Sequence, residues 1–139
     1  MNLPHDWSVG LPYDSISGEG CVAFLQGGIG WYSKSFPTTI SANQKCYIVF
    51  DGVYNNSEYW INGKKLGYHP SGYAPFYFDV TDYLNPNEDN RMTVRVDHSH
   101  YADSRWYTGS GIYRDVKMIV TDRTAYSGLG NICHYSRGY

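Results

Sequence analysis

The sequence predicts a single all-β domain, built as a sandwich or a barrel. None of the 139 residues lies in a segment with sustained helical periodicity. Strand and turn signals instead recur roughly every 8 to 12 residues, a spacing typical of sandwiches and barrels. In residues 91–97 apolar and polar side chains also alternate, as expected of a strand with one buried face. The chain length suits one domain.

The first half of the chain contributes two predicted strands. Residues 30–36 alternate between two faces and end at Pro37, which cannot donate a ladder hydrogen bond. Residues 45–53 contain the most apolar run of the chain, Cys-Tyr-Ile-Val-Phe, and are predicted to form a central strand. Cys46 lies inside this strand and is expected to be buried as a small hydrophobic residue.

A β-hairpin is predicted next. Residues 58–61 alternate polar and aromatic or β-branched side chains, and residues 64–67 form the returning strand of the hairpin. Between them, Asn62-Gly63 supplies the two positive-φ positions of a type I′ turn. Residues 69–75 then form a predicted loop that prolines at both ends stiffen.

Three further elements complete the prediction. Residues 76–80 are expected to be extended, and residues 81–84 to form at most one helical turn, with Thr81 as its cap. The alternating segment described above follows as a strand, and residues 111–121 are predicted to be the last strand.

Composition and charge exclude several classes of protein. The formal net charge is −2 and there is no basic stripe, so a nucleic-acid partner is not expected. No apolar run approaches the roughly 18 residues of a membrane span, so we expect no membrane partner. Aromatic residues make up 17% of the chain, which suits either a tyrosine-rich core or faces that pack against sugar rings.

No cofactor or metal site is predicted. The three cysteines, at positions 21, 46 and 133, match no zinc or redox spacing, and their odd number argues against a closed disulfide framework. His98 and His100 could face the same way on a strand, but no third ligand lies at a readable spacing.

Four blocks of the sequence resemble one family. The hairpin itself carries much of the resemblance, and the other blocks precede and follow it in order. The blocks are residues 3–8 (Leu-Pro-His-Asp-Trp-Ser), residues 27–36, residues 50–76 including the hairpin, and residues 103–114 (Asp-Ser-Arg-Trp-Tyr-Thr-Gly-Ser-Gly-Ile-Tyr-Arg). Together they are similar to the N-terminal sugar-binding domain of family 2 glycoside hydrolases, most closely the bacterial β-galactosidase-like members.

The resemblance implies a jelly-roll, galactose-binding-like β-sandwich. In such enzymes this domain accompanies an immunoglobulin-like domain and a (β/α)8 barrel that supplies two catalytic glutamates. Retaining hydrolysis needs two carboxyl groups about 5 Å apart. The candidate carboxyl groups of this chain do not lie in the family's catalytic motifs; they belong to Glu19, Glu58, Asp97 and Asp103. We therefore expect no catalytic residue in the chain and no activity of the chain alone.

The resemblance also suggests a substrate-binding loop. In the family, the loop before the last strand reaches the sugar subsite, and in this chain it spans residues 98–110. Asp103 and Arg105 are candidates to hydrogen-bond sugar hydroxyls, while Trp106 or Tyr107 would pack on the apolar face of a ring. The alternative is that Arg105 and Trp106 only brace the loop against its own sandwich.

The two ends of the chain depart from the family pattern. Residues 1–122 correspond to the sugar-binding domain, but without the additional strand that usually precedes the first block. Residues 123–139 do not resemble the family linker. A one-base shift of their codons can encode Gly-Thr-Tyr-Val-Thr-Thr-Pro-Glu, so we hypothesise that this tail is the linker read in a shifted frame.

The function expected from the sequence is that of a non-catalytic sugar-binding domain in a β-galactosidase-like enzyme of carbohydrate metabolism. Its expected partners are galactoside-type carbohydrate, bound weakly by the chain alone, and the other domains of the parent, with self-association also possible. Two alternatives stay open: an autonomous carbohydrate-binding module, or a structural docking domain without sugar affinity. A bacterial cytoplasm and a periplasm fit the sequence equally.

Overall fold

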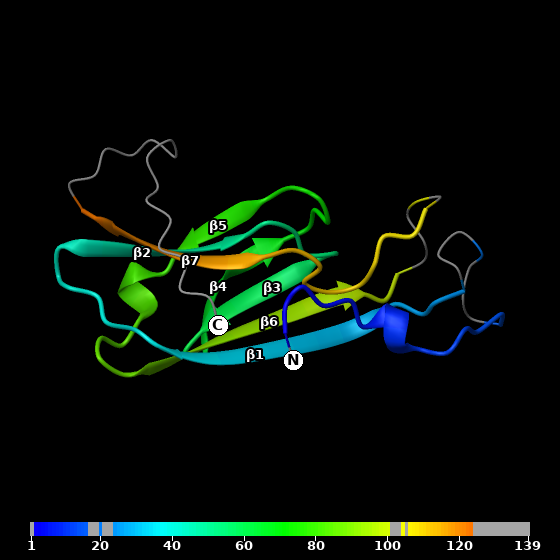
Figure 1. Ribbon diagram of the computed structural model, residues 1–139, viewed down its shortest axis with the longest axis horizontal. Coiled ribbons are helices and arrows are strands. Elements are labelled where there is room, and N and C mark those ends of the chain that lie inside the picture. The colour runs from blue at the N-terminus through cyan, green and yellow to red at the C-terminus, as the bar shows by residue number, and fades with distance from the viewer. Residues whose placement is uncertain (1, 17–19, 21–23, 101–103, 105, 124–139) are drawn as a thin grey trace.

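The protein is a β-sandwich of two antiparallel sheets (Figure 1). The computed structural model describes residues 2–16, 20, 24–100, 104 and 106–123. The strands are β1 (Gly28–Pro37), β2 (Gln44–Phe50), β3 (Ser57–Ile61), β4 (Lys64–His69), β5 (Phe76–Asp79), β6 (Asp89–His98) and β7 (Val116–Asp122). Within the described residues, the short 3-10 helices η1 (Ser8–Gly10) and η3 (Thr81–Tyr83) interrupt the connections. No helix of this described part is both long and apolar enough to cross a membrane.

The larger sheet has the strand order β1-β6-β3-β4, and the smaller has the order β5-β2-β7. The predicted central position of β2 is confirmed. The predicted turn between β3 and β4 is confirmed as well, because Asn62 and Gly63 have φ values of 51° and 79°. Such positive values match the right-handed twist of a two-residue hairpin.

The core lies between the two sheets and follows from strand alternation. In β3, every second side chain is buried, and the same is true through most of β6. Phe50 packs its ring 4.8 Å from Tyr59 and 5.2 Å from Phe76, measured between centroids. Cys46 is fully buried, as predicted, and burial raises the pKa of its thiol to about 11.

Two local predictions were wrong. Thr81 does not cap η3: Val80 is the N-cap, and the Thr81 hydroxyl instead accepts the Cys46 backbone N–H at 2.9 Å. The last strand begins at Val116 rather than at residue 111. Gly111 has a φ of 118°, outside the extended region, so it makes only an isolated bridge to Tyr54.

Candidate functional site

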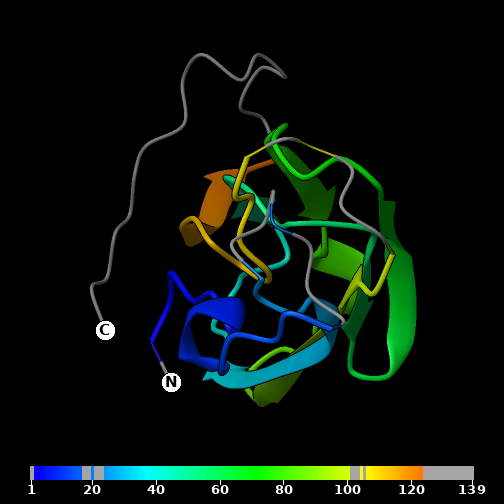
Figure 2. The same cartoon turned by 90° about the vertical axis from the view of Figure 1, so that its right-hand side faces the viewer.

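The candidate site lies at the end of the sandwich where β6 ends (Figures 1 and 2). There the N-terminal segment runs beside the segment that leads to β7. The His5 backbone N–H donates to the Ile112 carbonyl at 2.8 Å, and the Trp7 N–H donates to the Ser110 carbonyl at 3.1 Å. Two stretches about a hundred residues apart in sequence thus form one short ladder. We call this region, residues 3–8 with residues 104 and 106–114, the loop end.

Asp6 is the polar centre of the loop end. Its Oδ1 accepts the backbone N–H of Ser8 at 2.9 Å and that of Ser110 at 3.0 Å. Its Oδ2 accepts the hydroxyl of Tyr107. One half-buried carboxylate therefore satisfies donors from both stretches, and hydrogen bonds to a charged acceptor are stronger than neutral ones.

A second group of polar side chains lies beneath this carboxylate. Ser8 and Ser110 are each 1% exposed, and their hydroxyl oxygens are 2.6 Å apart. The Ser8 hydroxyl also donates to the Gln26 carbonyl at 2.9 Å, and His98 Nδ1 lies 2.7 Å from Ser110 Oγ. These contacts tie the loop end to the end of β6 and to the segment entering β1.

Two glycines allow aromatic rings to pack directly on the backbone in this region. A Cβ at Gly72 would lie 2.1 Å from the ring of Tyr54, and one at Gly111 would lie 2.1 Å from the hydroxyl oxygen of Tyr32. The Tyr32 hydroxyl lies 3.1 Å from His5 Nδ1, so the close approach at Gly111 places this hydroxyl against the N-terminal segment. Larger residues at either position would push the loops away from the sandwich.

An open cleft of about 340 Å³ lies on the surface of the loop end. Aromatic and polar side chains line it: Asp6, Tyr73, Trp106, Tyr107, Thr108, Gly109, Tyr113 and Arg114. Trp106 is 61% exposed, and its indole N–H donates to the Tyr73 hydroxyl at 3.1 Å. A second cleft, of about 520 Å³, shares Tyr113 and Arg114 with the first.

The structure describes some of the predicted site residues and not others. Trp106 and Tyr107 are brought together on this cleft, whereas Asp103 and Arg105 lie outside the described residues. The Tyr107 hydroxyl is already bonded to Asp6, so this side chain braces the loop while its ring lines the cleft. Partial burial, and then the hydrogen bond to Asp6, raise the pKa of Tyr107.

Sequence reasoning missed two residues of the site. Asp6 lies in the first block of the resemblance, but nothing in the sequence indicates that it meets Tyr107. Tyr73, which holds the Trp106 indole, lies in the loop between two prolines. The signal in the sequence for Tyr73 was that an aromatic residue lies in a loop with prolines at both ends.

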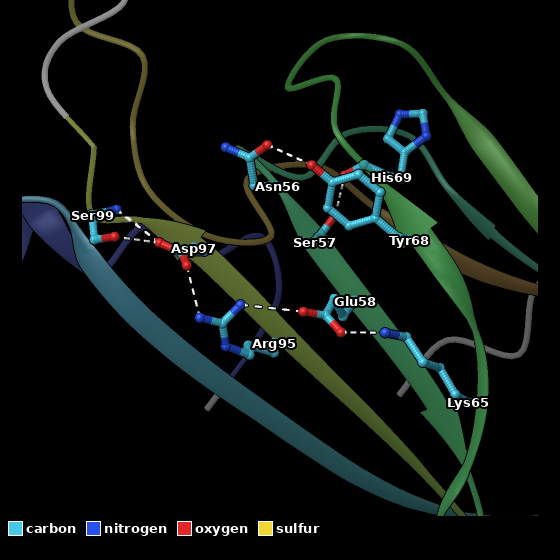
Figure 3. A network of polar contacts seen from close by, with 9 residues as sticks. All are labelled: Asn56, Ser57, Glu58, Lys65, Tyr68, His69, Arg95, Asp97 and Ser99. Atoms are coloured by element: carbon cyan, nitrogen blue, oxygen red, sulfur yellow. Dashed lines mark hydrogen bonds and ion pairs between the residues drawn. The ribbon is translucent and has the colours of Figure 1, made fainter.

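Two of the candidate carboxyl groups, those of Glu58 and Asp97, have structural partners (Figure 3). Glu58 pairs with Lys65 at 2.5 Å and with Arg95 at 3.4 Å, and Arg95 also pairs with Asp97 at 2.7 Å. Hydrogen bonds from Ser99, and then Arg95, lower the pKa of Asp97, while partial desolvation opposes them. In the described part of the chain, no group of three or more His, Cys, Asp or Glu side chains could hold a metal ion.

Comparisons with known proteins agree with the fold and extend it. The family model for the sugar-binding domain of glycosyl hydrolases family 2 matches residues 21–122. The β-galactosidase BoGH2A of Bacteroides ovatus is 44% identical over 133 residues, which are 94% of this chain and 16% of that protein. A β-glucuronidase of Bacteroides fragilis is 32% identical over 135 residues, 93% of this chain and 19% of that protein.

A solved structure gives the same result. The crystal structure of a β-glycosidase from Bacteroides vulgatus superposes with a TM-score of 0.81 at 46% identity, covering 88% of this chain and 16% of that one. The chain thus spans less than a fifth of the length of these relatives. The predicted β-sandwich and the predicted family are confirmed, and the chain belongs to the sugar-binding domain family of the family 2 glycosyl hydrolases.

Proposed function

We propose that the chain acts as the non-catalytic sugar-binding domain of a larger family 2 hydrolase that acts on β-galactosides. In this proposal the loop end contributes one wall of the substrate entrance. The reacting carboxylates belong to a barrel domain elsewhere in the parent enzyme, which also carries an immunoglobulin-like domain. The relatives include enzymes named β-galactosidase and β-glucuronidase, and the 44% identical one is a β-galactosidase.

The single observation that carries this proposal is that Trp106 is exposed on a loop held in place by hydrogen bonds. We call these the Asp6 cluster: hydrogen bonds from Tyr107 and Ser110 to the Asp6 carboxylate tie the loop to the N-terminal segment. The Tyr73 hydroxyl holds the indole from the other side. An exposed aromatic ring in a fixed orientation can pack against the apolar face of a sugar ring without first losing conformational freedom.

Tyr73, Thr108 and Arg114 surround that ring with hydroxyl and guanidinium groups. Such groups can hydrogen-bond sugar hydroxyls while the aromatic ring contacts carbon. We include Asp103 and Arg105 in the proposed subsite, because the resemblance places them in the same loop. An open cleft of this kind covers only one side of a sugar, so we expect the chain alone to bind galactosides more weakly than about 1 mM.

The first test is a titration of the purified chain with galactose and lactose, followed by tryptophan fluorescence. We expect a folded protein with no saturation up to about 1 mM and no hydrolysis of a chromogenic β-galactoside. Saturable binding below that concentration, abolished by Trp106→Ala, would favour an autonomous carbohydrate-binding module instead.

The second test places the chain in an enzyme. Residues 2–122 would replace the matching segment of BoGH2A, and the chimera would be assayed for galactoside hydrolysis. We expect Trp106→Ala to raise KM about tenfold, equivalent to about 1.4 kcal/mol, with a smaller change in kcat. The matched control is Tyr77→Ala, an aromatic residue that is 50% exposed on β5, away from the cleft. Equal effects of the two variants would favour a purely structural docking domain.

A further inference from the structure

The outer face of the four-stranded sheet carries a surface unrelated to the loop end. None of the residues that line the two clefts lies on this face. In a half-buried sheet the solvent-facing positions are expected to be small or charged. On this sheet they include two tryptophans, Trp31 on β1 and Trp60 on β3.

The two indoles form a stacked pair. Their centroids are 5.6 Å apart with an interplanar angle of 28°. Strand β6 lies between β1 and β3, and the register places Arg95 opposite Trp31 and Thr93 opposite Trp60. The rings therefore meet above β6. Trp31 is 62% exposed, so much of its surface is open to solvent.

A row of paired charges runs across three strands of the same sheet (Figure 3). It consists of Asp97 and Arg95 on β6, Glu58 on β3 and Lys65 on β4, joined by ion pairs of 2.7, 3.4 and 2.5 Å. Lys65 Nζ also lies 5.7 Å from the centroid of the Trp60 ring. Two acidic and two basic groups cancel, so the row has no net charge.

This combination fits a neutral carbohydrate better than other ligands. The apolar face of a sugar ring packs on an indole, and carboxylate and guanidinium groups hydrogen-bond its hydroxyls. Nucleic acids and acidic polysaccharides need unpaired cations, whereas both basic side chains of the row are neutralised by Glu58 and Asp97. Within the row, this charge balance argues against those polymers.

The size of the surface favours a chain of sugars over a single one. From Trp31 on β1 to Lys65 on β4 the face crosses three strand spacings, roughly 14 Å. Further exposed side chains continue it at both edges: Ile29 is 51% exposed on β1, and Tyr68 is 54% exposed on β4. The Tyr68 hydroxyl donates to Asn56 Oδ1 at 2.8 Å, which fixes its ring.

We propose that this sheet face is a second carbohydrate-binding site, which takes a neutral polysaccharide. Trp31 supplies the stacking surface, with Trp60 supporting it, and Arg95 and Glu58 supply hydrogen bonds to hydroxyls. The site holds the domain on polymeric material independently of the loop end. It does not depend on the function proposed above, since the two surfaces share no residue.

The test is affinity electrophoresis of the chain in native gels that contain soluble pectic β-galactan or hydroxyethylcellulose. Polygalacturonate serves as the anionic comparison. We expect retardation by at least one neutral polymer and none by polygalacturonate. Trp31→Ala is expected to raise the dissociation constant about tenfold or more, as for loss of an aromatic anchor. Tyr77→Ala, the matched control at an exposed aromatic residue on β5 of the other sheet, is expected to leave retardation unchanged.

A second variant separates binding from folding. Ser33 is exposed on the same face of β1, two residues from Trp31, so Ser33→Arg should block the surface without removing either indole. Both variants should keep the far-UV circular dichroism of the parent. The proposal is overturned if neither neutral polymer retards the chain, or if retardation is lost in Tyr77→Ala. A dimer, detected by light scattering, that Trp31→Ala dissociates also overturns it, because the face would then belong to a second copy.

Discussion

The core of the sandwich and the loop end are stabilised by different interactions. In the core, alternating strands bury apolar and aromatic side chains between two sheets, and the rings of Phe50, Tyr59 and Phe76 pack with centroids 4.8 to 5.3 Å apart. In the loop end, one carboxylate and two buried serines satisfy backbone and hydroxyl donors. Burial of apolar area is not directional, whereas hydrogen bonds are.

This difference indicates how each region responds to change. Removing side-chain volume from the core should lower the free energy of unfolding of the whole domain, and the loss should grow with the volume removed. The loop end contributes less to global stability but determines where Trp106 is held. A variant there should open the loop locally before the sandwich unfolds.

The largest effect is expected from Phe50→Ala in the core. Phe50 is 1% exposed, and its removal leaves a cavity between the sheets. We expect a loss of about 3–5 kcal/mol in the free energy of unfolding, measured by urea denaturation. The control is Tyr77→Ala on the outer face of the same sheet, which should cost far less. A loss below about 1 kcal/mol for Phe50→Ala would contradict a core centred on this ring.

Asp6→Ala should have the second largest effect, concentrated in the loop end. It leaves the Ser8 and Ser110 amides and the Tyr107 hydroxyl without their acceptor, at a cost of about 2–3 kcal/mol. Hydrogen exchange should accelerate at Ser110 more than at core amides such as Val94. Asp6→Asn, which keeps one acceptor oxygen, should be milder, and Asp82→Ala, an exposed carboxylate, is the control. Equal acceleration of hydrogen exchange in all strands would contradict a stabilising role of Asp6 that is confined to the loop end.

Tyr107→Phe should cost about 1 kcal/mol or less, since it removes one hydroxyl from the Asp6 cluster. Its pH dependence is more informative. The pKa of Tyr107 is raised in the folded state, so the folded protein holds this proton more tightly than the unfolded chain. The resulting stability is present below pH 10 and is lost as the pH rises further. Between neutral and alkaline pH, the Tm of the parent should fall more steeply than the Tm of Tyr107→Phe. Tyr77→Phe is the control.

The smallest effect is expected at His69, the last residue of β4. Its ring stacks on Phe76 at 3.8 Å, and burial lowers its pKa, although a hydrogen bond with the Ala74 backbone opposes this. The unfolded chain therefore takes up this proton first, so stability is present above pH 6.5 and is lost as the pH falls below that value. The change in Tm between neutral and mildly acidic pH should be smaller in His69→Gln. Replacement of the exposed His100 by Gln serves as the control. Equal slopes of Tm against pH in the parent and in His69→Gln would contradict a contribution of His69 to the pH dependence of stability.

Much of the fold was predictable because it depends on local patterns. The alternation in β3 and β6, the apolar run of β2 and the Asn62-Gly63 turn each require only neighbouring residues. The start of β7 was wrong by several residues, since Gly111 fits a strand pattern by sequence and is excluded by its backbone angle. Part of the candidate site was also predictable: Trp106 and Tyr107 were predicted as aromatic residues of a binding loop, and both line the cleft.

The sequence by itself determined the all-β class, the hairpin and the family, because periodicity, turn chemistry and ordered motifs are read along the chain. Only the tertiary structure decided which distant residues meet. Asp6 and Tyr107 are 101 positions apart, and Trp31 and Trp60 lie on strands separated by β6. Strand order and the path of the loops bring these side chains together, and such long-range pairing leaves no periodic signal in the sequence.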